Sequence, residues 1–174
     1  MKYGFGELDT YIGDIWELAT EAFINPVHDN LRPTPGIAQQ LLRRAGPEVS
    51  NLLSQRGNIG VGHAFISDAG DLRAKFLVHI SIGTLAHKPS IGTVDDALEE
   101  AFLLCQRQSL KSVAVPPIAM DPGELPVGVC ANILVKHALT SLNRSSLPER
   151  VVLVAPSKYV ENIYQQAIDK FILD

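Results

Sequence analysis

The sequence predicts an α/β fold of three layers, in which helices cover both sides of a mixed central sheet of about six strands. Short segments such as 76–82 and 151–155 are apolar on both faces, which is typical of strands that are buried on both sides. Amphipathic helical segments such as 97–105 and 127–138 alternate with these strands. With 174 residues, the chain is expected to form a single domain over residues 1–174.

The first elements are predicted from β-forming residues and turn signals. Residues 2–15 fit an extended opening, with a hairpin turn at 9–10. Residues 16–21 fit either a short helical turn or a loop. Residues 21–25 are expected to form a buried strand. Asn25 and the following proline should end this strand, because asparagine favours turns and proline lacks the amide that strand pairing needs.

The chain is organised around residues 24–46, which fit a strand end, a stiff loop and the start of a helix. Thr34 is expected to cap this helix, Pro35 to take its first position, and Gly36 to keep side-chain bulk away from the amides. Apolar residues follow at helical spacing as far as Ala45. Exposed amides beside a bare glycine suit an anion, although an ordinary strand–loop–helix connection fits the same residues.

Helices and strands continue to alternate through the rest of the chain. A helical segment at 47–56 precedes a glycine-rich passage and a hairpin of strands at 63–67 and 76–82. Thr93 is expected to cap the next helix. The last predicted elements are a strand at 112–115, a helix beginning at Pro126, a strand at 151–155 and a helix capped by Ser157.

Three of the predicted loops lead from a strand into a helix. They follow Ile24, Val115 and Ala155. In open α/β sheets, ligands bind outside the carboxyl ends of the strands. We therefore expect these three loops to lie on one edge of the sheet and to flank a binding site.

Composition is typical of a globular protein and argues against several other classes. Hydrophobic residues make up 46% of the chain and charged residues 20%, and the formal net charge of −4 comes from acids and bases that are mixed along the chain. No basic run or aromatic–basic stripe indicates an extended nucleic-acid surface, and no apolar run is long enough to cross a bilayer. No signal peptide follows Met1, so a cytoplasmic protein without membrane contact is expected.

Cysteines and histidines do not form a recognisable metal motif. Cys105 and Cys130 lie within apolar helical patterns and are predicted to be buried free thiols. The five histidines show no metal-ligand spacing with them, so neither a metal nor a cofactor is expected. His79 lies in an apolar strand, where a hydrogen-bonded core histidine is the expected interpretation.

Four motifs occur in an order that matches one known family. Residues 13–15 form a Gly-Asp-Ile signature, and residues 24–38 place an asparagine and a glycine ahead of a helix. Residues 62–79 fit a characteristic hairpin, and residues 116–118 with Pro126 fit the frame of a second phosphate loop. Together these motifs cover nearly the whole chain and resemble the macro domain, the α/β module that binds ADP-ribose.

The resemblance implies that the protein binds ADP-ribose or an ADP-ribosylated macromolecule. By position, Asp14 would accept a hydrogen bond from the adenine amino group, with the Ile15 amide nearby. Gly36 and the Ile37 amide would face the diphosphate, and Asn25 would brace the loop near the distal ribose. The second-loop residues implied to close over the ligand are Gly123 and Glu124.

The catalytic end departs from the pattern of the family. His28 stands in place of a second asparagine, and Ala38 or Gln39 stands where many hydrolytic members have a catalytic aspartate. The residues available to activate a water molecule are His28, Asp29, Asp121 and Glu124, and His28 with Asp29 or Asp121 could form a base and its orienter. Enzymatic activity therefore stays open at this point.

Three functions are compatible with the sequence. The first is the binding of ADP-ribose or an ADP-ribosyl derivative in a cleft at the carboxyl edge of the sheet. The second is hydrolysis that removes ADP-ribose from protein or nucleic acid, or acts on O-acetyl-ADP-ribose. The third is a degenerate macro fold that serves as an interaction module, because Asp121 and Glu124 would each repel a diphosphate by roughly 1 kcal/mol.

Overall fold

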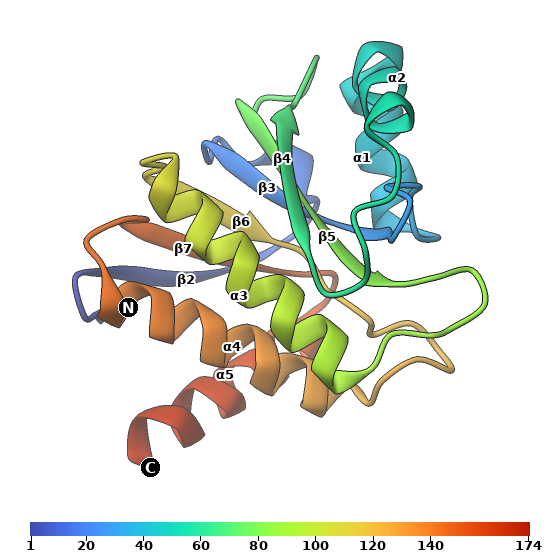
Figure 1. Cartoon of the computed structure of the whole chain (residues 1–174). Helices are drawn as coiled ribbons and strands as arrows, with labels where there is room; N and C mark the ends of the chain where they lie inside the picture. The colour runs from blue at the N-terminus through green and yellow to red at the C-terminus, as the bar shows by residue number, and fades with distance from the viewer.

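The computed structural model describes all residues, 1–174, and shows three layers with a sheet in the middle (Figure 1). The strands are β1 (Lys2–Tyr3), β2 (Gly6–Ile12), β3 (Ala22–His28), β4 (Ala64–Asp68), β5 (Phe76–Gly83), β6 (Ser112–Val115) and β7 (Arg150–Ala155). The helices are α1 (Ile37–Ala45), α2 (Pro47–Arg56), α3 (Ile91–Arg107), α4 (Val127–Arg144) and α5 (Lys158–Leu173), with a single 3₁₀ turn, η1 (Ile15–Glu17).

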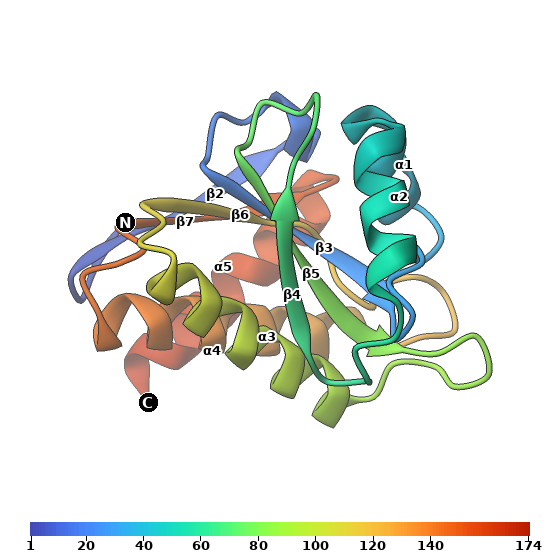
Figure 2. The ribbon, with the colours of Figure 1, turned by 45° about the horizontal axis from the view of Figure 1, so that its top comes forward.

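The sheet is mixed and has the strand order β1-β2-β7-β6-β3-β5-β4. The five central strands run parallel, whereas β1 and β4 pair antiparallel at the two edges. Helices α1 and α2 cover one face, and α3, α4 and α5 cover the other (Figure 2). The predicted three-layer fold is therefore confirmed, and the carboxyl ends of five parallel strands meet at one edge.

The sheet has seven strands rather than about six, and the opening hairpin, formed by β1 and β2, turns at a different place from the one expected. The turn between them lies at residues 4–5 and not at 9–10. Asp9 and Thr10 instead continue β2 and lie in register with residues of β7. The apolar and polar alternation of residues 6–12 suits a strand that is covered on one side only.

Strand β3 continues past the residues that were expected to end it. Strand β6 pairs with β3 only at Ala22 and Phe23. Pro26 is tolerated because, after Phe23, no amide of β3 is needed for a hydrogen bond to β6. The carbonyl oxygen of Pro26 accepts a hydrogen bond of 2.9 Å from the Thr34 hydroxyl. Thr34 therefore does not cap α1, and Gly36 occupies that position.

A second predicted cap is also displaced. Ser90 caps α3, and its side chain accepts a hydrogen bond from the amide of Thr93. Thr93 in turn accepts a hydrogen bond from the Ser90 amide, which completes a reciprocal capping box. The C-terminal helix begins as predicted, with the Ser157 side chain accepting from the Val160 amide.

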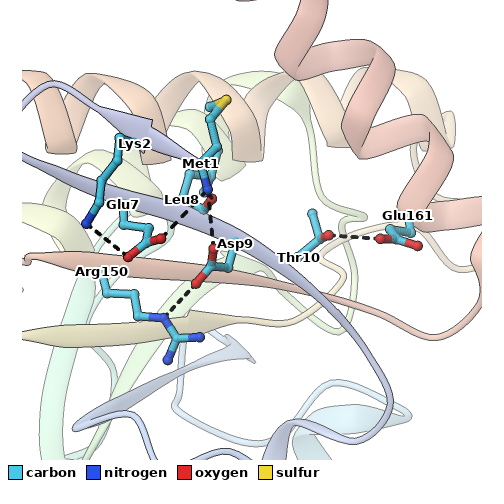
Figure 3. A network of polar contacts seen from close by, with 8 residues as sticks. All are labelled: Met1, Lys2, Glu7, Leu8, Asp9, Thr10, Arg150 and Glu161. Atoms are coloured by element: carbon cyan, nitrogen blue, oxygen red, sulfur yellow. Dashed lines mark hydrogen bonds and ion pairs between the residues drawn. The ribbon is translucent and has the colours of Figure 1, made fainter.

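Polar contacts fix the first long strand to its neighbours (Figure 3). Arg150 of β7 donates from Nε to Asp9 Oδ2 over 2.7 Å, and Thr10 donates to Glu161 of α5 over 3.0 Å. The amino group of Met1 donates to the Leu8 carbonyl oxygen over 2.8 Å. These contacts hold β2, whose carboxyl end leads directly into the candidate site.

A buried chain of hydrogen bonds crosses β3, β5 and β4. Asn25 Nδ2 lies 3.0 Å from His79 Nδ1, and His79 Nε2 lies 2.8 Å from Ser67 Oγ. If Asn25 donates to Nδ1, the Nε2 proton of His79 is free to donate to Ser67, which in turn donates to the Asp68 carbonyl oxygen. His79 is completely buried, as the sequence predicted, and burial lowers its pKa to about 3.

Both cysteines are free and buried, which confirms the predicted thiols. Burial raises the pKa of Cys105 to about 12 and that of Cys130 to about 11. No helix combines the length and the apolar character that crossing a membrane requires.

We predict that His79 makes the protein less stable in mild acid. The folded pKa of about 3 lies below the usual 6.5, so only the unfolded chain takes up this proton between those values. The contribution of His79 to the free energy of unfolding is fully present above pH 6.5 and falls as the pH decreases toward 3. At pH 5 the loss from this group is about 2 kcal/mol. Urea unfolding at pH 7 and pH 5 measures the loss, which should be smaller by that amount in His79→Gln. An equal loss in both proteins would show that folded His79 takes up a proton.

Candidate functional site

A cleft of about 400 Å³ opens at the carboxyl edge of the sheet. Its volume falls within the usual range of small-molecule sites. The loop after β3 contributes Pro35, the loop after β6 contributes Pro116, and the loop after β7 contributes Pro156. The three strand-to-helix loops therefore meet at one edge of the sheet, as the sequence predicted.

One wall of the cleft is formed where β2 ends. Gly13 donates its amide to the Ala155 carbonyl oxygen over 3.2 Å, which joins this end of β2 to β7. Asp14 follows and lines the cleft, with an exposed side chain that makes no capping hydrogen bond. Ile15 is buried beneath it and also lines the cleft. This wall therefore presents a free carboxylate above an apolar floor.

The opposite wall is the loop from β3 into α1. Besides the hydrogen bond from Thr34 to Pro26, a bridge between Val27 and Pro33 fixes this loop. Thr34, Pro35 and Ile37 line the cleft. The amide of Gln40 is the first to bond within the helix, to the Gly36 carbonyl oxygen, so the amides of residues 37–39 have no acceptor inside α1. Such a helix start favours a negatively charged group.

The second loop, residues 116–125, closes the cleft from the side of β6. It is folded back on itself, because Leu125 donates its amide to the Ala119 carbonyl oxygen and Glu124 donates its amide to that of Asp121. Lys88 donates to the Gly123 carbonyl oxygen over 3.0 Å and so pins the tip of the loop. Asp121 and Glu124 both line the cleft.

The cleft is acidic in its side chains. Three carboxylates line it, from Asp14, Asp121 and Glu124, and no lysine or arginine does. Burial raises the pKa of the Glu124 carboxyl, and the charge of Asp121 raises it further, whereas Lys88 acts in the opposite direction. An anion in this cleft would therefore be held by backbone amides. No group of three or more His, Cys, Asp or Glu side chains is arranged to hold a metal ion.

Half of the predicted site residues line the cleft, namely Asp14, Ile15, Ile37, Asp121 and Glu124. Asn25 instead lies in the buried chain with His79. Gly36 and Gly123 are exposed beside the cleft. The roles of all ten residues stay predictions.

The candidate catalytic residues are only partly brought together. His28 is half-buried, and its Nδ1 atom is buried without a hydrogen-bond partner. Asp29 accepts a hydrogen bond of 2.8 Å from Asn58 Nδ2, which ties it to the glycine-rich passage after α2. No hydrogen bond joins His28 to Asp29 or to Asp121, and of these three only Asp121 lines the cleft.

Several lining residues had no functional signal in the sequence. Thr34 fitted a helix cap, and Val160 fitted the inward face of a helix. Met120 stands in the second loop without any motif of its own. Their only signal was a position shortly after a strand, which many residues share, so the folded structure was needed to find them.

Comparisons with known proteins give a consistent result. The model of the Macro domain family matches residues 24–134. The O-acetyl-ADP-ribose deacetylase of Escherichia coli (strain K12) is 30% identical over 164 residues, which cover 90% of this chain and 92% of that protein. The protein of the same name from Enterobacter sp. (strain 638) is 27% identical over 169 residues and covers 93% of each chain.

Solved structures show the same fold. The Oceanobacillus iheyensis macrodomain with ADP has a TM-score of 0.88 at 19% identity, and the match covers 99% of this chain and 95% of that chain. The Trypanosoma brucei macrodomain in complex with ADP-ribose has a TM-score of 0.83 at 14% identity, covering 92% and 68%.

We predict that position 36 requires glycine because of its backbone conformation, and not because a side chain would be crowded there. Its φ of +93° is one that side-chain-bearing residues rarely adopt, and a Cβ atom there would meet nothing within 4 Å. Gly36→Ala should therefore lower the free energy of unfolding by about 1–3 kcal/mol. Gly128 in α4 is an equally open glycine with a helical backbone, so Gly128→Ala should raise stability by up to about 1 kcal/mol. Urea unfolding of both variants tests this, and equal effects would contradict it.

Proposed function

This chain belongs to the macro domain family, and from that premise we propose that it binds ADP-ribose or an ADP-ribosyl derivative in the cleft at the carboxyl edge of the sheet. One observation carries the proposal. A free carboxylate at Asp14 and the open helix start at Ile37 face the same cleft from opposite walls. A purine and a diphosphate need these two features together.

The adenine end is assigned to the wall at Asp14. An ionised carboxylate only accepts hydrogen bonds, so it matches the exocyclic amino group of adenine, which donates them. Such a charge-assisted bond is stronger than a neutral one. Pro156 and Val160 line the same cleft and offer apolar contacts to a planar ring.

The diphosphate is assigned to the start of α1. The unpaired amides of residues 37–39 and the partial positive charge of the helix N-terminus attract an anion there. Asp121 and Glu124 line the opposite side and repel it, which makes the affinity lower than amides alone would give. The site therefore suits a diphosphate that is held by hydrogen bonds from backbone amides.

The proposal extends to ADP-ribosyl groups attached to a macromolecule. The recognised parts are the purine and the diphosphate, so the distal ribose and anything bound to it remain free to vary. A cytoplasmic location belongs to the same proposal, since the two buried thiols are free and the fold contains no disulfide.

We predict that Asp14→Ala weakens ADP-ribose binding by about tenfold to a hundredfold, because a hydrogen bond to a charged group contributes about 1.5–3 kcal/mol. Isothermal titration calorimetry measures the Kd. Glu17→Ala is the matched control, because Glu17 is a neighbouring exposed carboxylate that bonds to Tyr11 and does not line the cleft. Equal affinities of the Asp14→Ala protein and the wild type would remove Asp14 from the adenine site. A wild-type Kd weaker than millimolar would count against a nucleotide pocket.

A second candidate function is the removal of the acetyl group from O-acetyl-ADP-ribose. It is favoured by the names of the relatives at 27–30% identity and by the acidic loop at the cleft. A water oxygen would attack the acetyl carbonyl carbon while Glu124 accepts the water proton. The ester bond then breaks, the ribose oxygen takes the proton back from Glu124, and ADP-ribose leaves together with acetic acid, which releases its proton to solvent as acetate. The raised pKa of Glu124 makes it a better proton acceptor than an ordinary carboxylate.

We predict that Glu124→Gln lowers the kcat for acetate release by at least about tenfold without raising KM, because the amide cannot accept a proton and no longer repels the diphosphate. Acetate can be followed by proton NMR. Asp169→Asn, on the exposed side of α5, is the control of equal charge change. A kcat unchanged in Glu124→Gln would exclude Glu124 as the base, and an inactive wild type would exclude this second function.

A further inference from the structure

A positively charged surface lies beside the acidic cleft. It is formed by the exposed side of α1, the turn before it and the C-terminal end of α2, and we call it the α1–α2 face. Its charged residues are Arg32, Arg43, Arg44 and Arg56. None of these four guanidinium groups forms an ion pair within the chain.

Charge is distributed unevenly along the chain: the segment that carries this face is basic, and the remaining residues are acidic. Residues 30–57 contain four arginines and one acid, Glu48, a net charge of +3. The remaining residues contain eleven basic and eighteen acidic side chains, a net charge of −7. A basic segment in an acidic protein indicates a surface for an anionic partner.

Two shallow hollows shape this face. One, of about 800 Å³, lies between α1 and α2 and includes Arg32 and Arg43. The other, of about 340 Å³, follows the outer side of α1 from Gly36 to Arg44. Arginine is the only charged residue that lines either hollow, and the remaining polar groups are amides and hydroxyls. The cleft shows the reverse pattern, because all of its charged lining residues are acidic.

Aromatic rings hold two of the arginines in place. The guanidinium of Arg44 lies 3.9 Å from the centre of the Trp16 ring, and that of Arg56 lies 5.5 Å from the centre of the Phe65 ring. A guanidinium that stacks on a ring keeps its in-plane N–H groups free to donate. Trp16 directly follows Ile15, a lining residue of the cleft, so this face borders the cleft.

We propose that the α1–α2 face binds the phosphate backbone of a nucleic-acid strand. Free guanidinium groups match phosphate oxygens with two parallel hydrogen bonds, and Gln39, Gln40 and Asn51 add neutral donors. A protein partner would need large apolar anchors, and Leu52 is the one large apolar side chain exposed on α1 or α2. A strand of regularly spaced phosphates therefore fits this face better than an acidic protein surface.

No basic run occurs in the sequence because the arginines are spread over residues 32–56. The two hollows bring Arg32, Arg43 and Arg44 together along α1, and Arg56 stands at the end of α2 over Phe65. The inference goes beyond ADP-ribose binding and does not depend on it, since the α1–α2 face and the cleft are lined by different side chains.

Fluorescence anisotropy with a labelled single-stranded oligothymidylate tests the proposal. For four phosphate contacts, the plot of log K against log salt should have a slope of about −3. Arg43→Gln/Arg44→Gln should halve this slope and weaken the Kd by about tenfold. Arg32→Gln/Arg56→Gln should have a similar effect from the other side of the face. Thermal melting confirms that both variants fold.

The control removes two positive charges elsewhere. Arg107→Gln/Lys170→Gln changes exposed residues of α3 and α5 that form no ion pair, and it should leave the Kd within about twofold. The proposal would be overturned if the control variant bound the oligonucleotide as weakly as the arginine variants, or if the wild type did not bind it at low salt. It would also be overturned if a polyglutamate peptide displaced the oligonucleotide with equal affinity. Calorimetry with ADP-ribose should give the same Kd for the arginine variants and the wild type, which separates this proposal from that for the cleft.

Discussion

The hydrogen bond from Thr34 to the Pro26 carbonyl oxygen is the contact on which the candidate site depends. It exists because β6 stops opposite Phe23, which leaves the next residues of β3 unpaired on that side. The freed carbonyl then binds the loop into α1 rather than another strand. As a result, the start of α1 is held over the gap that the short β6 leaves, and that gap is the cleft.

Much of the fold could be predicted because its signals are local and redundant. Segments such as 112–115 and 47–56 carry the signals of their element within a few neighbouring residues, and their positions agree with the structure. The errors occurred where a distant partner decides the outcome. Pro26 ends a strand only if its missing amide was needed, and that depends on where β6 stops. Thr34 has the chemistry of a cap, but the Pro26 carbonyl takes its hydroxyl instead.

The site was less predictable than the fold. The positions of Asp14 and Ile37 beside the cleft could be predicted, because each stands at the end of an element whose own position is predictable. The side chain of Asn25 was harder to place, because alternation along β3 directs it to the α1–α2 side, where His79 binds it. The separation of an acidic cleft from the basic α1–α2 face was not visible at all, since both depend on contacts between distant segments.

A crystal of this protein soaked in ADP-ribose would show whether the cleft binds the nucleotide in the proposed way. We predict that the diphosphate oxygens lie within hydrogen-bond distance of the Ile37 amide and that the adenine amino group lies beside the Asp14 carboxylate. A cleft that stays empty at saturating nucleotide, or a nucleotide found on the arginines of the α1–α2 face instead, would contradict it.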